Sequence, residues 1–303
     1  MTTQDDPGTP VAQGRQVAAQ SDEGKVRSYY EFRGRKNTGW ALYRSFLDAK
    51  KLYVNYGYWK AGCTNLDEAS EALADMLAEV AGIKPGDRVL DAGFGYGEQD
   101  VRWARTFGPL RIHGLNITPA QVDAARARIA EEGLADMVDL RVGSATEVPF
   151  GDATVDRVVA LESAMHFHTR QRFFEEAVRV LVPGGTLATA DILPSRVEAP
   201  GKGPVARLNR WVRERTMPSE NWYTMSEYAA RLERAGFVDV DVRPITEHVI
   251  APRLDFIRAR FDAPENRGRS WFERMQMRLL LWAAEKQRGT REYILAVARK
   301  PAT

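Results

Sequence analysis

The sequence predicts an α/β fold with a seven-stranded, mostly parallel sheet and helices on both faces. Short apolar runs alternate with helical patterns between residues 65 and 190, which is typical of βαβ units. The alternation lapses over residues 195–224, a segment rich in Pro, Gly and Arg, which we interpret as a lid inserted after strand five. Ten aromatic residues fall within 29–59, before the first strand, and predict an N-terminal aromatic cap.

Each predicted element has a local signal. Leu66, Leu73 and Leu77 share one helical face, Asn65 is a suitable N-cap with Glu68 three residues on, and Gly82 ends the helix. The predicted strands cover 88–92, 111–115, 138–142, 155–161, 186–190, 238–244 and 292–298. The predicted helices cover 98–106, 119–132, 169–181, 225–235, 253–262 and 270–287.

Three regions follow from this pattern. Residues 1–28 contain no apolar segment like that of a signal peptide and are expected to be a disordered tail. Residues 29–64 are expected to form a helical cap, which offers a surface for a homo-oligomer. Residues 65–303 are expected to form one domain that carries the lid insertion 195–224.

Composition excludes several classes of function. The 43 Lys and Arg against 41 Asp and Glu give a net charge of +2, so nothing indicates a nucleic-acid partner. Cys63 is the only cysteine and there are four histidines, so we expect no disulfide, no metal site and a reducing, cytoplasmic location. No apolar run approaches the ~20 residues of a membrane span, and we expect no membrane partner.

The most informative segment is VLDAGFGYGE, residues 89–98, in which an apolar strand ends in Asp91 and three alternate glycines. Glycines at this spacing let the backbone approach a ligand closely, and the helix that follows offers free N–H groups. A dinucleotide fingerprint would be G-x-G-x-x-G, whereas this loop reads G-x-G-x-G after an acid that suits an ammonium group. The loop therefore predicts a nucleoside site.

Two later segments fall at the same edge of the predicted sheet. Asn116 ends the second strand about 20 residues after the glycines, where dinucleotide sites use an acid to hold the ribose hydroxyls. The polar turn 143–150 follows the third strand and offers a lining for an adenine edge. We expect the three loops to converge on one crevice at the carboxyl ends of the strands.

At these residues the chain resembles the Rossmann-like class I S-adenosylmethionine-dependent methyltransferases, in the branch that acts on sterols, quinones and other small natural products. The resemblance rests on NYGYW (55–59), VLDAGFGYG (89–97), GLNITPAQ (114–121), GSATEVPF (143–150), LESAMHF (161–167), RVLVPGG (179–185) and ADILP (190–194). It implies S-adenosylmethionine as the cofactor, bound by Tyr56, Asp91, Gly93, Gly95, Gly97, Asn116, Ile117, Gln121, Ser144, Ala145 and Glu162.

The resemblance also divides these residues among the parts of the cofactor. Asp91 and the glycines would border methionine and ribose, and Asn116 with Gln121 would face the ribose. Ser144 and Ala145 would border adenine. Many relatives carry an acid where Asn116 stands and an Asp where Ser144 stands, so this chain departs from the family at both positions.

The candidate catalytic residues follow strand four. If the acceptor is a hydroxyl, His166 is the better base; if it is an alkene carbon, Glu162 would stabilise a carbocation and remove its proton. An apolar or aromatic acceptor would be enclosed by Tyr29, Tyr30, Trp59, His166, Trp211, Trp222 and Tyr223.

We therefore expect methyl transfer to a carbon or oxygen of a small, largely apolar natural product, isoprenoid- or polyketide-like, in specialised metabolism. Within enzymes, the alternative is a sugar or polyketide O-methyltransferase with His166 as general base. Outside enzymes, the alternative is a catalytically silent scaffold that binds S-adenosylmethionine. A nucleic-acid methyltransferase is disfavoured, because the chain lacks a basic stripe and an Asp/Asn-Pro-Pro-Tyr/Phe motif after strand four.

Overall fold

A computed structural model describes residues 23–31, 39–196, 217–286 and 288–303. Its centre is a seven-stranded sheet in the order β3-β2-β1-β4-β5-β7-β6. The strands are β1 (Arg88–Ala92), β2 (Arg111–Asn116), β3 (Val138–Val142), β4 (Val155–Leu161), β5 (Leu181–Pro194), β6 (Val238–Pro244) and β7 (Arg291–Arg299). Neighbours from β3 to β5 pair in parallel, and β7 runs antiparallel to β5 and β6. The predicted fold class is confirmed, although β5 begins earlier than the predicted 186.

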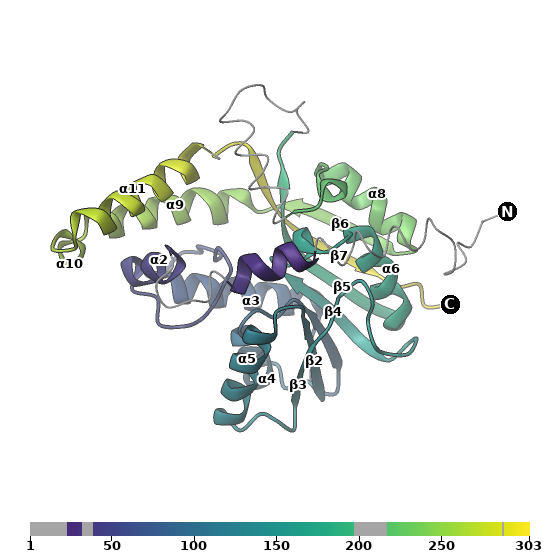
Figure 1. The fold of residues 1–303 in the computed structure, drawn as a ribbon. Coiled ribbons are helices and arrows are strands. Elements are labelled where there is room, and N and C mark those ends of the chain that lie inside the picture. The colour runs from purple at the N-terminus through teal and green to yellow at the C-terminus, as the bar shows by residue number, and fades with distance from the viewer. Residues whose placement is uncertain (1–22, 32–38, 197–216, 287) are drawn as a thin grey trace.

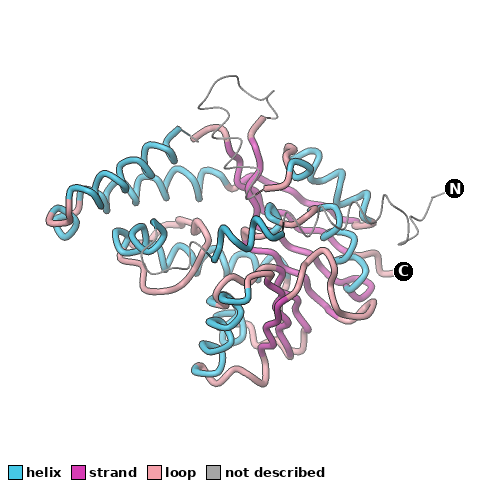
Figure 2. Tube along the Cα trace, viewed as in Figure 1, coloured by secondary structure: helices cyan, strands magenta, loops and turns pink. Residues whose placement is uncertain are grey.

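Helices cover both faces of the sheet, as Figures 1 and 2 show. One apolar cluster joins the sheet to α3 (Leu66–Ala81), α4 (Glu98–Thr106), α5 (Pro119–Glu131) and α9 (Thr246–Asp262). A second cluster, on the opposite face, joins it to α6 (Arg170–Val180) and α8 (Met225–Ala235). Besides a helix over residues 23–31, the remaining described elements are α2 (Gly39–Leu47), α10 (Pro264–Arg267), α11 (Trp271–Lys286) and the 3₁₀ turns Ala164–His166 and Ser219–Asn221.

The helix ends confirm some of the local signals and correct others. Asn65 caps α3 by accepting a hydrogen bond from the Glu68 N–H, and Gly82 ends it with a φ of 69°. By contrast, α9 begins at Thr246, earlier than the predicted 253, and carries Pro252 inside it. The early start buries Val249 in the core, a tertiary contact that outweighs the helix-breaking tendency of Pro252.

The N-terminal segment differs from the prediction. Residues 23–31 form a helix, the darkest purple one in Figure 1, which crosses in front of the sheet. The disordered tail predicted to reach residue 28 is therefore wrong from Glu23 onward, because Val26 is 4% exposed and anchors this helix on the domain. In the cap predicted over 29–64, α2 is helical and packs Phe46 on Phe261, whereas residues 48–64 are mostly loop.

A buried ion pair joins α6 to the end of β5. Arg170 and Asp191 are both fully buried, with Nε donating to Oδ2 at 2.8 Å. The remaining guanidinium nitrogens donate to the carbonyls of Ile192 and Asn221, at 3.0 and 2.5 Å. The Arg170 guanidinium also lies 5.2 Å from the ring of Tyr223, which is buried in this cluster rather than in a lid.

Arg170→Met is expected to lower the free energy of unfolding by about 3–5 kcal/mol, because Asp191 would remain buried without its partner. Denaturant unfolding monitored by circular dichroism measures this. The matched control is Arg172→Met, since that arginine is 63% exposed and its pair with Glu175 should change stability by no more than about 0.5 kcal/mol. Equal losses in the two variants would contradict the assignment.

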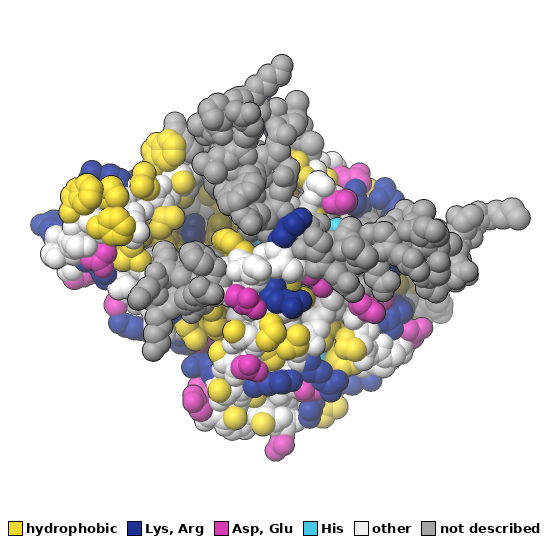
Figure 3. Space-filling model, viewed as in Figure 1, with side chains coloured by type: hydrophobic (Ala, Val, Ile, Leu, Met, Phe, Trp, Pro, Cys, Tyr) yellow, Lys and Arg dark blue, Asp and Glu magenta, His cyan; other side chains and the backbone are white. Residues whose placement is uncertain are grey.

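The hairpin of α9 and α11 projects from the sheet and carries exposed apolar side chains. Trp271, Phe272 and Leu279 are 76%, 57% and 57% exposed, and hydrophobic side chains gather over this hairpin in Figure 3. No helix in the described ranges is long and apolar enough to cross a membrane.

Candidate active site

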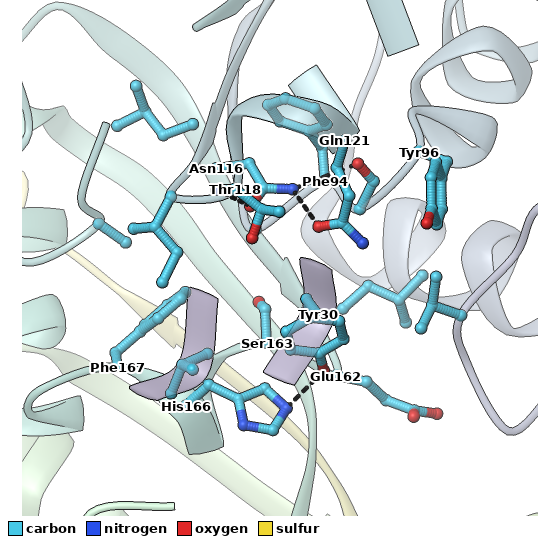
Figure 4. Close-up of a pocket in the computed structure, with 18 of the residues that line it drawn as sticks. Tyr30, Phe94, Tyr96, Asn116, Thr118, Gln121, Glu162, Ser163, His166 and Phe167 are labelled. Atoms are coloured by element: carbon cyan, nitrogen blue, oxygen red, sulfur yellow. Dashed lines mark hydrogen bonds between the residues drawn. The ribbon is translucent and has the colours of Figure 1, made fainter. Parts of the chain in front are cut away.

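A pocket opens at the carboxyl ends of β1 to β4 and encloses about 840 Å³, including space open to solvent. Its lining comes from the glycine loop, from the loops after β2, β3 and β4, from the segment 52–55 and from the helix 23–31 (Figure 4). The predicted convergence of three loops on one crevice is thus present, and three further segments join them.

The glycine loop has the backbone that its spacing predicts. Gly93, Gly95 and Gly97 have φ angles of 89°, 59° and 76°, a region that side-chain-bearing residues rarely adopt. A Cβ on Gly93 would lie 2.4 Å from the Ser163 Cβ, so only glycine fits there. A Cβ on Gly95 would have a Val54 methyl group as its nearest neighbour, at 3.5 Å. Gly95 and Val54 both line the pocket. The loop leaves room for a ligand at Gly95.

The loop after β2 presents a fixed amide to the pocket. The Asn116 amide donates to the Gln121 side chain at 3.0 Å and to the Gly95 carbonyl at 3.2 Å, as Figure 4 shows in part. The Asn116 side-chain oxygen accepts a hydrogen bond from the Thr118 N–H at 3.1 Å. Asn116 therefore ties its own loop to the glycine loop. The Gln121 side chain holds the Asn116 amide by accepting its hydrogen bond.

Beyond β3, Ser144 and Ala145 line the pocket, as predicted. The Ser144 hydroxyl donates to the carboxylate of Glu23, which comes from the helix 23–31. It also contacts the Thr146 hydroxyl at 2.9 Å and accepts from the Thr146 N–H at 3.2 Å. A carboxylate from the N-terminal helix thus stands beside the serine.

His166 lies in the 3₁₀ turn after β4 and lines the pocket. Its Nε2 is 2.8 Å from the hydroxyl of Tyr30, and the two rings meet edge to face at 5.5 Å. Tyr29 packs edge to face on Tyr30 at 5.3 Å but does not line the pocket. The predicted catalytic and substrate residues His166 and Tyr30 are therefore brought together.

Glu162, directly after β4, also lines the pocket and has a φ of 50°. Its Oε1 accepts from the Tyr56 N–H at 2.6 Å and from the Tyr293 hydroxyl at 2.8 Å. Burial raises the pKa of Glu162 to about 7, although these two hydrogen bonds act in the opposite direction. This acid therefore titrates near neutral pH.

The raised pKa of Glu162 predicts a pH-dependent stability. Because the folded-state pKa of about 7 exceeds the ordinary glutamate pKa of 4.5, the carboxyl's contribution is complete below pH 4.5 and is lost as the pH rises through 7. Glu162→Gln keeps the acceptor oxygen and does not ionise. We expect the stability of the variant relative to wild type to rise by about 3 kcal/mol between pH 4.5 and 8, measured by denaturant unfolding. A constant difference would contradict the burial of this charge.

Asp91 is fully buried and does not line the pocket, although the resemblance places it beside the cofactor. Its Oδ2 accepts from the Gln99 amide at 3.0 Å. The carboxyl group of Asp100, also fully buried, interacts electrostatically with that of Asp91. Burial raises the pKa of both groups, and the charge on Asp91 raises that of Asp100 further. Gln99, which lines the pocket, stands between this pair and the ligand space.

Several other predicted site residues do not line the pocket. Tyr56 supplies only its backbone N–H to Glu162, and its ring packs under the Arg253 guanidinium at 3.9 Å. Trp59 donates to the Tyr56 carbonyl and packs on Phe256. Gly97, Trp222 and Tyr223 are also absent from the lining, and Trp211 lies outside the described residues.

The pocket contains residues that sequence reasoning missed. Gln99 had a signal, because it lies in the first turn of the helix that follows the glycines. Glu23 and Val26 had none, because they stand in a segment of low hydrophobicity that becomes ordered only by packing on the domain.

Comparisons with known proteins agree with this geometry. The model of the mycolic acid cyclopropane synthetase family matches residues 24–277. The chain is 42% identical over 256 residues to erythromycin 3''-O-methyltransferase of Saccharopolyspora erythraea. The alignment covers 82% of this chain and 84% of that protein. It is 31% identical over 261 residues to 27-O-demethylrifamycin SV methyltransferase of Amycolatopsis mediterranei, covering 82% and 90%.

A solved structure supports the fold. Geranyl diphosphate C-methyltransferase of Streptomyces coelicolor A3(2) superposes with a TM-score of 0.69 at 21% identity, covering 97% of this chain and 99% of that one. Fold, pocket and relatives together define a class I S-adenosylmethionine-dependent methyltransferase. Within that class, the chain belongs to the mycolic acid cyclopropane synthetase family.

Proposed function

We propose that this chain transfers the methyl group of S-adenosylmethionine to a hydroxyl oxygen of a polyketide-like natural product. The observation that carries the proposal is the imidazole of His166, which lies in the pocket 2.8 Å from the Tyr30 hydroxyl. Figure 4 places it across the pocket from Asn116 and Gln121. The names of the two relatives above, an erythromycin 3''-O-methyltransferase and a 27-O-demethylrifamycin SV methyltransferase, favour an oxygen acceptor.

The cofactor would occupy the part of the pocket beside the glycine loop. Bound S-adenosylmethionine supplies a methyl group on a sulfonium, which an aligned nucleophile attacks directly. We assign its methionine and ribose end to Gly93, Gly95 and Asn116, because Gly93 and Gly95 line the pocket without side chains and the Asn116 amide is held in place. Its adenine would lie beside Ser144 and Ala145, which line the same pocket.

His166 is the better candidate for the base. The acceptor hydroxyl must lose a proton as its oxygen attacks, and an imidazole takes up protons near neutral pH. We propose that the Tyr30 hydroxyl relays the proton to His166 Nε2, since the two atoms are within hydrogen-bond distance. Glu162 is less available, because its Oε1 already accepts from the Tyr56 N–H and the Tyr293 hydroxyl.

A carbon acceptor is the second candidate, because Glu162 lines the same pocket and its pKa is raised to about 7. Reaction with ¹³C-methyl-labelled S-adenosylmethionine and a panel of desmethyl polyketides distinguishes the two. The O-transfer proposal expects a ¹³C signal in the methoxy region together with S-adenosylhomocysteine. A signal in the C-methyl region would replace it with carbon transfer. Cofactor binding without turnover on any acceptor would favour the silent scaffold.

The cytoplasmic location and the homo-oligomer through residues 29–64 stay predictions. Size-exclusion chromatography with light scattering tests the second. We expect a mass of at least two chains of 34.0 kDa each. The mass of a single chain would contradict the homo-oligomer.

A further inference from the structure

The helix 23–31 reaches both ends of the pocket. Glu23, at its start, accepts a hydrogen bond from Ser144 beyond β3, and Tyr30 contacts His166 beyond β4. Seven residues of α-helix span about 10 Å, so one rigid segment connects the two positions. Val26, between them, is buried and lines the pocket, and it holds the helix in place.

Around Ser144, the carboxylate of Glu23 is the group that can accept a hydrogen bond from a ligand at this end of the pocket. The Ser144 hydroxyl is held by the Thr146 N–H and the Thr146 hydroxyl, and it donates to Glu23 Oε1. The second oxygen, Oε2, receives no hydrogen bond from the part of the chain that the structure describes. Gly143 and Ala145, the neighbours of Ser144 in the lining, have no polar side chain. A ligand with an N–H group at this position would donate a hydrogen bond to the Glu23 carboxylate.

Adenine has such a donor in its exocyclic amino group. We propose that Glu23 reads the adenine of the cofactor by accepting a hydrogen bond from that amino group, and that Ser144 is the positioning residue that orients the carboxylate. This assignment rests on the proposed function, which places adenine beside Ser144 and Ala145. A hydrogen bond to a charged acceptor is about twice as strong as a neutral one, so the contact discriminates between bases.

Calorimetric titration with two nucleosides tests the proposal without turnover. S-adenosylhomocysteine carries the amino group, and S-inosylhomocysteine carries a carbonyl oxygen in its place. Wild type is expected to prefer the adenosyl compound. Glu23→Ala is expected to weaken its binding about tenfold and not to weaken the binding of S-inosylhomocysteine, whose carbonyl oxygen the carboxylate would repel, so that the preference collapses.

Two further variants sharpen the result. Glu31→Ala is the matched control, because Glu31 is exposed on the same helix and does not line the pocket; both affinities should equal those of wild type. Adding Ser144→Asp to Glu23→Ala returns a carboxylate to the same end of the pocket and should restore the preference for adenine.

The results of the titrations distinguish a failure of the proposed function from a failure of the Glu23 assignment. A wild type that binds neither compound overturns the proposed function and the Glu23 assignment together. A wild-type preference for adenine that survives in Glu23→Ala overturns only the Glu23 assignment. An equal fall of both affinities in Glu23→Ala also overturns it, because the carboxylate would then only hold the helix on the domain.

Discussion

Gly95→Val is expected to abolish binding of S-adenosylhomocysteine while leaving the protein folded. The branched side chain would stand in the space between Gly95 and Val54, both of which line the pocket. The same change forces a β-branched residue to a φ of 59°, which costs about 1–2 kcal/mol of stability. Calorimetric titration measures the binding, and thermal unfolding measures the stability.

The chain provides a close control for this backbone effect. Gly108 has a φ of 57° but faces open space outside the pocket. Gly108→Val should therefore lose a similar amount of stability and retain the affinity for S-adenosylhomocysteine. If both variants bind equally well, the glycine loop does not hold the cofactor.

His166→Ala is expected to lower kcat by about 10²- to 10⁴-fold, because it removes the general base. The KM for S-adenosylmethionine and the affinity for S-adenosylhomocysteine should change little, since the imidazole is assigned to the acceptor. His248→Ala is the control: that side chain is 46% exposed and does not line the pocket.

A companion variant tests the relay. Tyr30→Phe keeps the ring packing against His166 and removes only the hydroxyl, so kcat should fall while cofactor affinity is retained. Turnover of His166→Ala within a few-fold of wild type would remove the base from the mechanism and favour carbon transfer at Glu162.

The parts that the sequence predicts well are those set by neighbours along the chain. The strand β1, the glycines after it and the cap at Asn65 depend on local spacing and backbone preference, and all of them appear where expected. Asn116 and His166 reach the pocket because parallel strands end at one edge of the sheet.

The parts that fail depend on distant contacts. Tyr223 lies within the predicted lid, but its partner Arg170 lies 53 residues earlier in the chain, and that pairing draws the ring into the core. The position of Asp91 beside the glycines does not reveal which way its side chain points, and the carboxyl turns inward to Gln99 and Asp100. Glu23 is ordered by contacts with Ser144, 121 residues away.

The inward turn of Asp91 has a consequence for the charge of the whole molecule. The formal net charge of +2 counts every carboxyl group as an anion. Two carboxyl groups that face one another away from water favour a shared proton, because two adjacent buried anions repel. Folding at neutral pH should therefore take up a proton at this pair, which leaves the pair one charge less negative than the composition implies. Refolding in a weakly buffered solution would register that uptake as a rise in pH, and the double variant Asp91→Asn/Asp100→Asn should abolish the contribution of the pair.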